Sequence, residues 1–316
     1  MHILHPKTHY QTFPKLKTVK TALEVTENAT ARTRGLLRAA MPDGLSDQQA
    51  TDLRQVLGLG RQPPINSFAS NTHVRSLLVP RFIEVLMRTW SLLCERQMQF
   101  LTIAPDGWHI DEERPILRPK AWREEAARWL AQLGFTGMGF IEFAPYLNHP
   151  SARHGRVLSG HLHAVGFADD ESTYRRKITR LSDRLEGLNA IGNFAVNRPV
   201  TLTEGDLAMV ARYLIDQLRY AKRLSPSRKN PGRFVTRDAE LPLHLALRSA
   251  EILTYLKFTD LIVTRGGTGW QWRQELIRSV GPALTQASLV REDLDDLWCA
   301  VWRLKDREHY MRVSRP

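Results

Sequence analysis

Two histidines, His161 and His163, stand two residues apart in the apolar segment 157–167, which is typical of a β-strand. Because alternate side chains of a strand face the same side, both imidazoles can converge on one cation. Glu142 lies in the middle of an earlier apolar segment, where a charge is costly unless it is paired, exposed or bound to a cation. If the two strands pair, the three side chains suit Mg²⁺ or Mn²⁺ better than Zn²⁺. The alternative is that they are ordinary solvent-facing strand residues.

A tyrosine and a glutamine, Tyr213 and Gln217, stand one helical turn apart in the segment 203–222, which has a capping-box sequence at its start and helical periodicity. Positions i and i+4 share a helix face, and here they lie at the margin of the apolar stripe. Such a tyrosine is more typical of an amphipathic edge than of a nucleophile. It becomes a candidate nucleophile only if this helix lies beside the histidine strand.

A strongly basic segment follows this helix. Between Leu218 and Arg237 there are seven Lys or Arg and no acidic residue, within a sequence rich in Ser, Pro and Gly. We expect a linker or loop, either simply solvated or in contact with phosphates. The candidate DNA-binding residues are Arg219, Lys222, Arg223, Arg228, Lys229 and Arg233.

Composition limits the class of protein. The 316 residues carry 45 Lys plus Arg against 33 Asp plus Glu, a formal charge of +12, which makes a polyanion the first partner to consider. Two distant cysteines exclude a disulfide framework and a cysteine zinc finger. With no apolar run long enough to cross a membrane and no readable signal peptide, we expect a cytoplasmic protein without a membrane partner.

The central part of the chain alternates strand and helix patterns, which predicts an α+β fold with helices on one face of an antiparallel sheet. The segments 137–146 and 157–167 are expected to form a hairpin with a long polar loop. The glycine-rich segment 264–269 lacks the Lys-Ser/Thr ending of a phosphate-binding loop and is interpreted as a plain turn. The remaining predicted strands are 97–104 and 193–199, and the helices are 119–133, 173–188 and 203–222.

The patterns along the whole chain predict three regions. These are an N-terminal extension with a lead-in helix (1–96), the α+β domain (97–225), and a basic linker with a helical C-terminal region (226–316). In the first 70 residues only 46–57 is convincingly helical, with Ser46 as N-cap. The lead-in helix 74–96 is expected to break at Pro80. Three C-terminal helices are predicted at 243–256, 270–280 and 293–304.

Taken together, the strand Phe100–Ile103, the sequence His161-Leu-His163 and a helical Tyr213 about 50 residues later resemble the HUH superfamily of single-strand DNA endonucleases. This superfamily includes rolling-circle replication initiators of plasmids and filamentous phages, and transposases of small insertion sequences. The resemblance implies a palm-like antiparallel sheet with flanking helices. It makes Tyr213 the nucleophile and the two histidines metal ligands, with Glu142 or Gln217 as the third.

The resemblance also implies an activity: nicking and rejoining of single-stranded DNA through a 5′-phosphotyrosine, with Mg²⁺ or Mn²⁺, at an origin or a hairpin. A host helicase is then a further expected partner. Many initiators have a lysine three or four residues after the tyrosine, whereas this chain has Asp216 and Gln217. The glutamine is similar to the Tyr-x-x-x-Gln motif of the transposases. Tyr220 is a candidate second nucleophile, although its spacing of seven residues from Tyr213 is wider than the three or four residues of two-tyrosine members. A transposase and a non-catalytic DNA-binding or copy-control protein therefore remain alternatives to a replication initiator.

Overall fold

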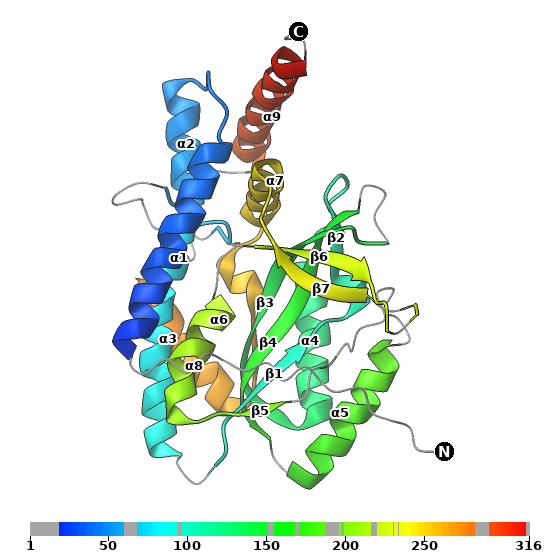
Figure 1. Ribbon diagram of the computed structural model, residues 1–316. Coiled ribbons are helices and arrows are strands. Elements are labelled where there is room, and N and C mark those ends of the chain that lie inside the picture. Colours follow the sequence, from blue (N-terminus) through cyan, green and yellow to red (C-terminus); the bar gives the residue numbers. More distant parts are fainter. Residues whose placement is uncertain are drawn as a thin grey trace.

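Two long paired strands form the centre of the computed structural model. Strand β3 (Phe135–Leu147) pairs antiparallel with β4 (Arg156–Ala168) along their whole length, which confirms the predicted hairpin. The fold is α+β, with a curled sheet covered by helices (Figure 1). The structure describes residues 19–59, 68–93, 96–150, 155–168, 171–186, 196, 199–215, 220–229, 231–232, 234–281 and 291–313.

The strand order is β5-β1-β4-β3-β6-β7, while β2 pairs with β4 and β8 with β3. All of these pairs are antiparallel except β3 with β6, so the sheet is mixed and the expectation of a wholly antiparallel sheet is wrong. The parallel pair arises because helix α6 carries the chain back to the β3 edge before β6 begins. The bounds are β1 (Gln99–Ile103), β2 (His109–Asp111), β5 (Val200–Thr201), β6 (Ala221–Pro226), β7 (Phe234–Ala239) and β8 (Ile262–Arg265).

Within this sheet, four strands and two helices follow the order β1-α4-β3-β4-α5-β5, a split βαβ arrangement with β4 between β1 and β3. The predicted helices at 119–133 and 173–188 are confirmed as α4 (Pro119–Leu133) and α5 (Glu171–Glu186). Gly134 ends α4 in the left-handed conformation, with a φ of 66°, as its position suggested. The predicted strand at 193–199 is represented by a bridge of Val196 to Ile103 and by β5 just beyond it.

Helices cover both faces of the sheet, so the expectation of helices on one face is wrong. The reason lies in strands such as β1, whose five residues are all buried and therefore need a partner on each side. One face packs on α4, α5 and α7 (Leu243–Thr254). The opposite face, called the site face below, packs on α1 (Val19–Ala40), α3 (Thr72–Leu92), α6 (Leu207–Ile215) and α8 (Gly266–Val280).

The two ends of the chain share a third core, in which α1, α2 (Asp47–Leu57), α7 and α9 (Arg291–Val313) pack together at one end of the molecule (Figure 1). Ser46 caps α2 in a capping box, as predicted. The predicted boundaries between the three regions, at residues 96 and 225, separate elements that share a core or pair in the sheet. These boundaries stay a prediction. Of the described helices, none has the length and apolarity needed to cross a membrane.

Helix α1 contradicts the expectation of a single helix in the first 70 residues. Its buried stripe is built largely from alanines and threonines, and the Thr26 and Thr33 hydroxyls donate to the carbonyls of Ala22 and Ala29. A stripe of such small and polar side chains produces little hydrophobic periodicity, which is why the pattern was weak.

Four further expectations are corrected. The predicted helix 203–222 is shorter: a 3-10 turn, η2 (Glu204–Asp206), leads into α6, and a strand, not helix, begins at Ala221. The predicted basic linker is the β6–β7 hairpin. Helix α3 continues through Pro80, and the predicted turn 264–269 is the end of β8 and the start of α8. The predicted C-terminal helices are confirmed as α7, α8 and α9; the other 3-10 turns are η1 (Asp106–Trp108) and η3 (Phe258–Leu261).

Candidate metal and nucleophile site

The predicted ligands Glu142, His161 and His163 lie together on the site face. Glu142 stands directly opposite His161 in the β3–β4 register, and His163 lies two residues further along β4. Because positions directly opposite in an antiparallel pair share a face, all three side chains project to the same side of the sheet. The ring of His161 lies 5.9 Å from that of His163, centroid to centroid.

His163 is held between a hydroxyl and a carboxylate. Its Nδ1 forms a hydrogen bond of 2.9 Å with Thr102 Oγ1 on β1, and its Nε2 lies 2.8 Å from Glu142 Oε2. The His163 side chain is only 2% exposed, whereas that of Glu142 is 24% exposed. In metal sites one imidazole nitrogen binds the ion while a hydrogen bond holds the other, so Thr102 would fix Nδ1 and leave Nε2, beside Glu142, as the nitrogen that faces an ion.

Burial and neighbouring charges set the protonation of this group. Burial would raise the pKa of Glu142, but the contact with His163 and the charges of His161 and Arg75 outweigh it and lower that pKa below its ordinary value. Burial, and then His163, lowers the pKa of His161 to about 4, against the attraction of Glu142. At neutral pH Glu142 is thus ionised and His161 neutral, the forms in which both groups bind a divalent cation.

Tyr213 reaches this group from α6, which packs on the same face. Its ring meets that of His163 edge-on, with centroids 4.7 Å apart, and that of Phe100 at 5.7 Å. The structure therefore brings the predicted nucleophile beside one predicted ligand. Tyr220 lies just before β6, beyond the end of α6, and is 50% exposed. Gln217, Arg219 and Arg233 lie outside the described residues.

Arg75 on α3 belongs to the same neighbourhood, although sequence reasoning did not single it out. Its Nε donates to the carbonyl of Ala69 at 2.9 Å and its Nη1 to that of Ile215, the last residue of α6, at 3.5 Å. Burial lowers the pKa of Arg75 to about 10, and the charge of Glu142 opposes this. Arg75 thus contacts the end of the tyrosine helix, and its charge acts on the Glu142 carboxylate. No spacing pattern in the sequence marks it, because its partners are backbone carbonyls, one of them 140 residues away on α6.

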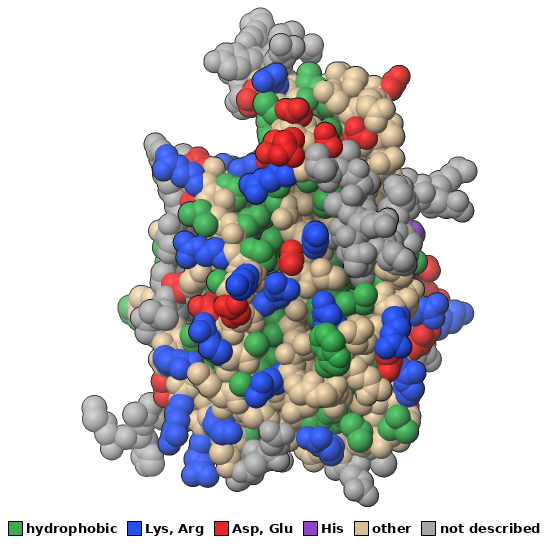
Figure 2. Space-filling view, turned by 180° about the vertical axis from the view of Figure 1, so that it is seen from behind, with side chains coloured by type: hydrophobic (Ala, Val, Ile, Leu, Met, Phe, Trp, Pro, Cys, Tyr) green, Lys and Arg blue, Asp and Glu red, His purple; other side chains and the backbone are tan. Residues whose placement is uncertain are grey.

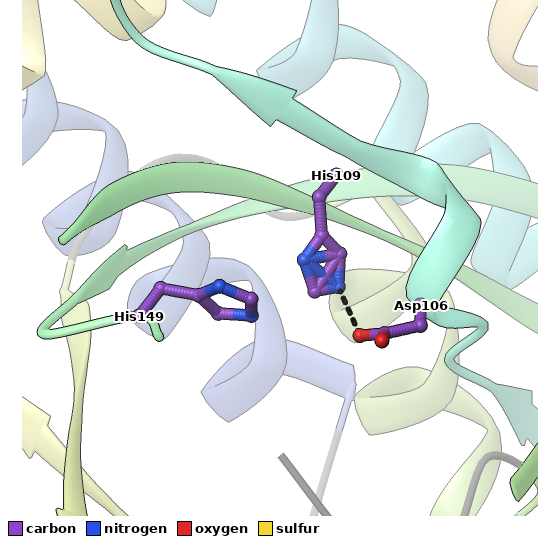
Figure 3. A group of neighbouring side chains, drawn as sticks. All are labelled: Asp106, His109 and His149. Carbon is purple, nitrogen blue, oxygen red and sulfur yellow. Dashed lines mark ion pairs between the residues drawn. The ribbon is translucent and has the colours of Figure 1, made fainter. Parts of the chain in front are cut away.

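A second group of potential ligands lies further along the sheet (Figure 3). Asp106 begins η1, His109 begins β2, and His149 follows β3 in a loop. Among the described residues, this is the set of three whose ligand atoms all lie within 4.8 Å of one another; Glu142, His161 and His163 are not so close. Sequence reasoning used Asp106 only as part of a turn. The three residues come from separate elements, so no motif reveals them.

The two groups are neighbours. His109 pairs with Ser159 on β4, and the Ser159 hydroxyl lies 3.2 Å from His161 Nε2. The ring of Tyr146 lies 6.0 Å from that of His161 and 6.2 Å from that of His149. His161 is therefore the member of the predicted site that lies nearest to the second group in these contacts.

The predicted DNA-binding residues that the structure describes lie on the β6–β7 hairpin or in its connection. Lys222 forms an ion pair with Asp238 on β7. Arg223, Arg228 and Lys229 are exposed. Basic charge is not confined to this hairpin, because Lys and Arg side chains are also spread over the opposite side of the molecule (Figure 2). The protein-family models, curated proteins and solved structures searched provide no match to this chain.

Proposed function

We propose that this protein is a metal-dependent endonuclease and strand transferase of the HUH kind, which nicks and rejoins single-stranded DNA through Tyr213. The observation that carries the proposal is the edge-on contact of Tyr213 with His163, on the face that also holds His161 and Glu142. A nucleophile and a candidate cation-binding group from separate elements thus meet on one surface.

The topology supports the same proposal. The His161-Leu-His163 sequence lies on β4, which is flanked by β1 and β3 within the split βαβ arrangement, and α6 follows the last strand of that arrangement. The resemblance to the HUH endonucleases implies a palm-like sheet that carries the two histidines on one strand and is followed by a tyrosine helix, and the assignment of this sheet to that fold is part of the proposal.

The proposed DNA cleavage needs both the tyrosine and the candidate cation-binding group. A free tyrosine has a pKa of about 10, so its phenol is a poor nucleophile at neutral pH. A divalent ion, Mg²⁺ or Mn²⁺, that Glu142, His161 and His163 would hold would supply Lewis-acid polarisation of the scissile phosphate. The Tyr213 oxygen would form a bond to phosphorus as the bond from phosphorus to the 3′ oxygen breaks. The phenol proton passes overall to the leaving 3′ oxygen, so the products are a 5′-phosphotyrosine and a 3′-OH. The phosphotyrosine ester conserves the bond energy, so a 3′-OH can displace the tyrosine without ATP.

The β6–β7 hairpin supports a single-stranded DNA substrate. Arg223 and Arg237 stand directly opposite each other in its register, and both are exposed. Like charges at such positions destabilise a hairpin unless an anion lies between them. A DNA phosphate is an anion of the required charge, and β6 adjoins β3 next to the site.

The biological role that we propose is initiation of rolling-circle replication of a plasmid, phage or integrated mobile element. Its substrate is then the single-stranded origin, and a host helicase is the partner that would open the duplex.

The experiment is a covalent-adduct assay. The full chain is incubated with Mn²⁺ and single-stranded oligonucleotides that tile the DNA around its own gene, then denatured in detergent and separated by size. We expect an adduct that EDTA abolishes, that Tyr213→Phe loses and that the matched Tyr220→Phe variant retains. An adduct in the Tyr213→Phe protein would show that the proposed nucleophile is wrong.

A further inference from the structure

We propose that Asp106, His109 and His149 form a second metal site, selective for a transition ion such as Zn²⁺ and separate from the site of Glu142, His161 and His163. This inference goes beyond the proposed endonuclease and does not depend on it.

The geometry of the three side chains carries the proposal. Their ligand atoms all lie within 4.8 Å of one another. His109 Nε2 lies 3.2 Å from Asp106 Oδ1, and the rings of His109 and His149 lie 4.3 Å apart, centroid to centroid. In Figure 3 the His109 ring lies between the other two side chains. Donor atoms about 2 Å from a common ion lie roughly 3 Å from one another, so only a small inward movement is needed.

Burial of these three polar side chains costs folding free energy unless a ligand is bound. His149 is 1% exposed, and the side chains of His109 and Asp106 are 14% and 13% exposed. His109 Nδ1 is buried and has no hydrogen-bond partner among the described residues. A buried polar atom without a partner costs free energy, and an ion bound by this group would offset part of that cost.

The loop after β3 positions His149 before any ion arrives. Asn148 adopts a left-handed conformation, with a φ of 61°, and the His149 backbone N–H donates to the Gly155 carbonyl at 2.8 Å. Gly155 itself has a φ of 69°, and a Cβ there would lie 3.1 Å from the Asn148 Cα. This tight closure turns His149 inward, so the third ligand is preorganised.

The spacing of the ligand atoms, and not the donor set, indicates the class of metal. Two imidazoles and one carboxylate are also the donors of His161, His163 and Glu142, but here the three ligand atoms already lie within 4.8 Å of one another, the close spacing that a four-coordinate ion such as Zn²⁺ requires. Three protein ligands also leave at least one position for water or for an oxygen of a bound phosphate.

The test counts Zn²⁺ ions bound by the chelator-treated full chain, using equilibrium dialysis and elemental analysis. We expect two equivalents in the unmodified protein. Asp106→Asn and His149→Ala should each remove one equivalent, with affinity at that site reduced at least ~10-fold. His244→Ala, which changes an exposed histidine outside both groups, is the matched control and should still bind two.

A background variant isolates the second site. The double variant Glu142→Gln with His163→Ala should bind one equivalent, and adding His149→Ala should leave none. The proposal is overturned if Asp106→Asn and His149→Ala retain both equivalents, or if the background variant binds none. If the unmodified protein binds one equivalent that His149→Ala removes, the second site stands and the group of Glu142, His161 and His163 does not hold Zn²⁺; a Mn²⁺ titration of the same protein then decides whether that group binds the ion of the proposed endonuclease.

A melting-temperature measurement keeps the test valid if a variant folds poorly and its bound ions cannot be counted. Zn²⁺ in excess should raise the melting temperature of the background variant, because an ion that binds only the folded state stabilises it. The isosteric Asp106→Asn change in that background should abolish the rise. A rise that persists in that variant would overturn the proposal.

Discussion

His163 and Glu142 are in contact across neighbouring strands, with Nε2 of the histidine 2.8 Å from Oε2 of the glutamate. Thr102 on the other side of β4 fixes this contact, because its hydroxyl engages the second ring nitrogen of His163. Three adjacent strands, β1, β4 and β3, therefore contribute one residue each to a chain of polar contacts.

The Thr102 hydroxyl should matter for metal binding. Thr102→Val keeps the shape of the side chain but leaves His163 Nδ1 buried without its partner, which should destabilise the fold by about 1–3 kcal/mol. Since the ring loses its orientation, affinity for Mn²⁺ should fall about 10–100-fold. Urea unfolding and a Mn²⁺ titration measure the two effects. Thr102→Ser is the matched control; equal Mn²⁺ affinity in Thr102→Val and the unmodified protein would contradict the role of Thr102.

Arg75 should stabilise the junction of α3 and α6. Arg75→Met keeps much of the stem but removes the donors to Ala69 and Ile215 and the positive charge near Glu142. We expect a loss of about 1–3 kcal/mol in the free energy of unfolding, because two carbonyls lose their donors. Arg75→Lys retains the charge without the planar guanidinium group, so its free energy of unfolding should lie between those of the unmodified protein and Arg75→Met. A Met variant as stable as the unmodified protein in urea unfolding would disprove this role.

Arg223 should serve DNA binding more than folding. Because it faces Arg237, Arg223→Ala should change stability by no more than about 0.5 kcal/mol. It should weaken binding to single-stranded oligonucleotides and reduce the slope of log affinity against log salt by about 0.7. Fluorescence anisotropy at several salt concentrations measures both. Arg180→Ala, at an exposed position of α5, is the control; if the two variants lose affinity equally, the hairpin has no special role.

Gly269 should be required for the docking of α8. A Cβ at this position would lie 1.8 Å from the Gly137 carbonyl oxygen on β3, so Gly269→Ala forces helix and strand apart. We expect a loss of more than about 2 kcal/mol in unfolding free energy, as for overpacked cores. Gly267→Ala, in the same helix, meets nothing within 4 Å and should be neutral or slightly stabilising. Equal melting temperatures for the two variants would contradict this account.

Local patterns in the sequence were sufficient for the elements with strong signals. Helix α4 has an apolar stripe ending at a glycine, and α2 has a capping box, so both could be predicted closely. Helix α1 could not, since its buried face is rich in threonine and alanine. The β6–β7 hairpin was hidden because its basic, Ser- and Pro-rich sequence resembles a linker; pairing with β3 gives it structure.

Some residues of the candidate site could likewise be predicted from the sequence, and others could not. The spacing of His161 and His163 on one strand, and a charge within an apolar strand at Glu142, are visible in the sequence. Arg75 and the group of Asp106, His109 and His149 are not, because tertiary contacts between distant segments bring them together. Gln217 lies outside the described residues, so its role as a ligand stays a prediction.

The central claim is that Tyr213 forms the covalent bond to DNA, and peptide mapping of the adduct tests it most directly. Trypsin cleaves after Arg212 and Arg219, so Tyr213 and Tyr220 fall in different peptides. After reaction with Mn²⁺ and single-stranded DNA and removal of excess nucleotides, mass spectrometry should find the nucleotide on the peptide 213–219. A nucleotide on the peptide that begins at Tyr220, or on neither peptide, would contradict the account.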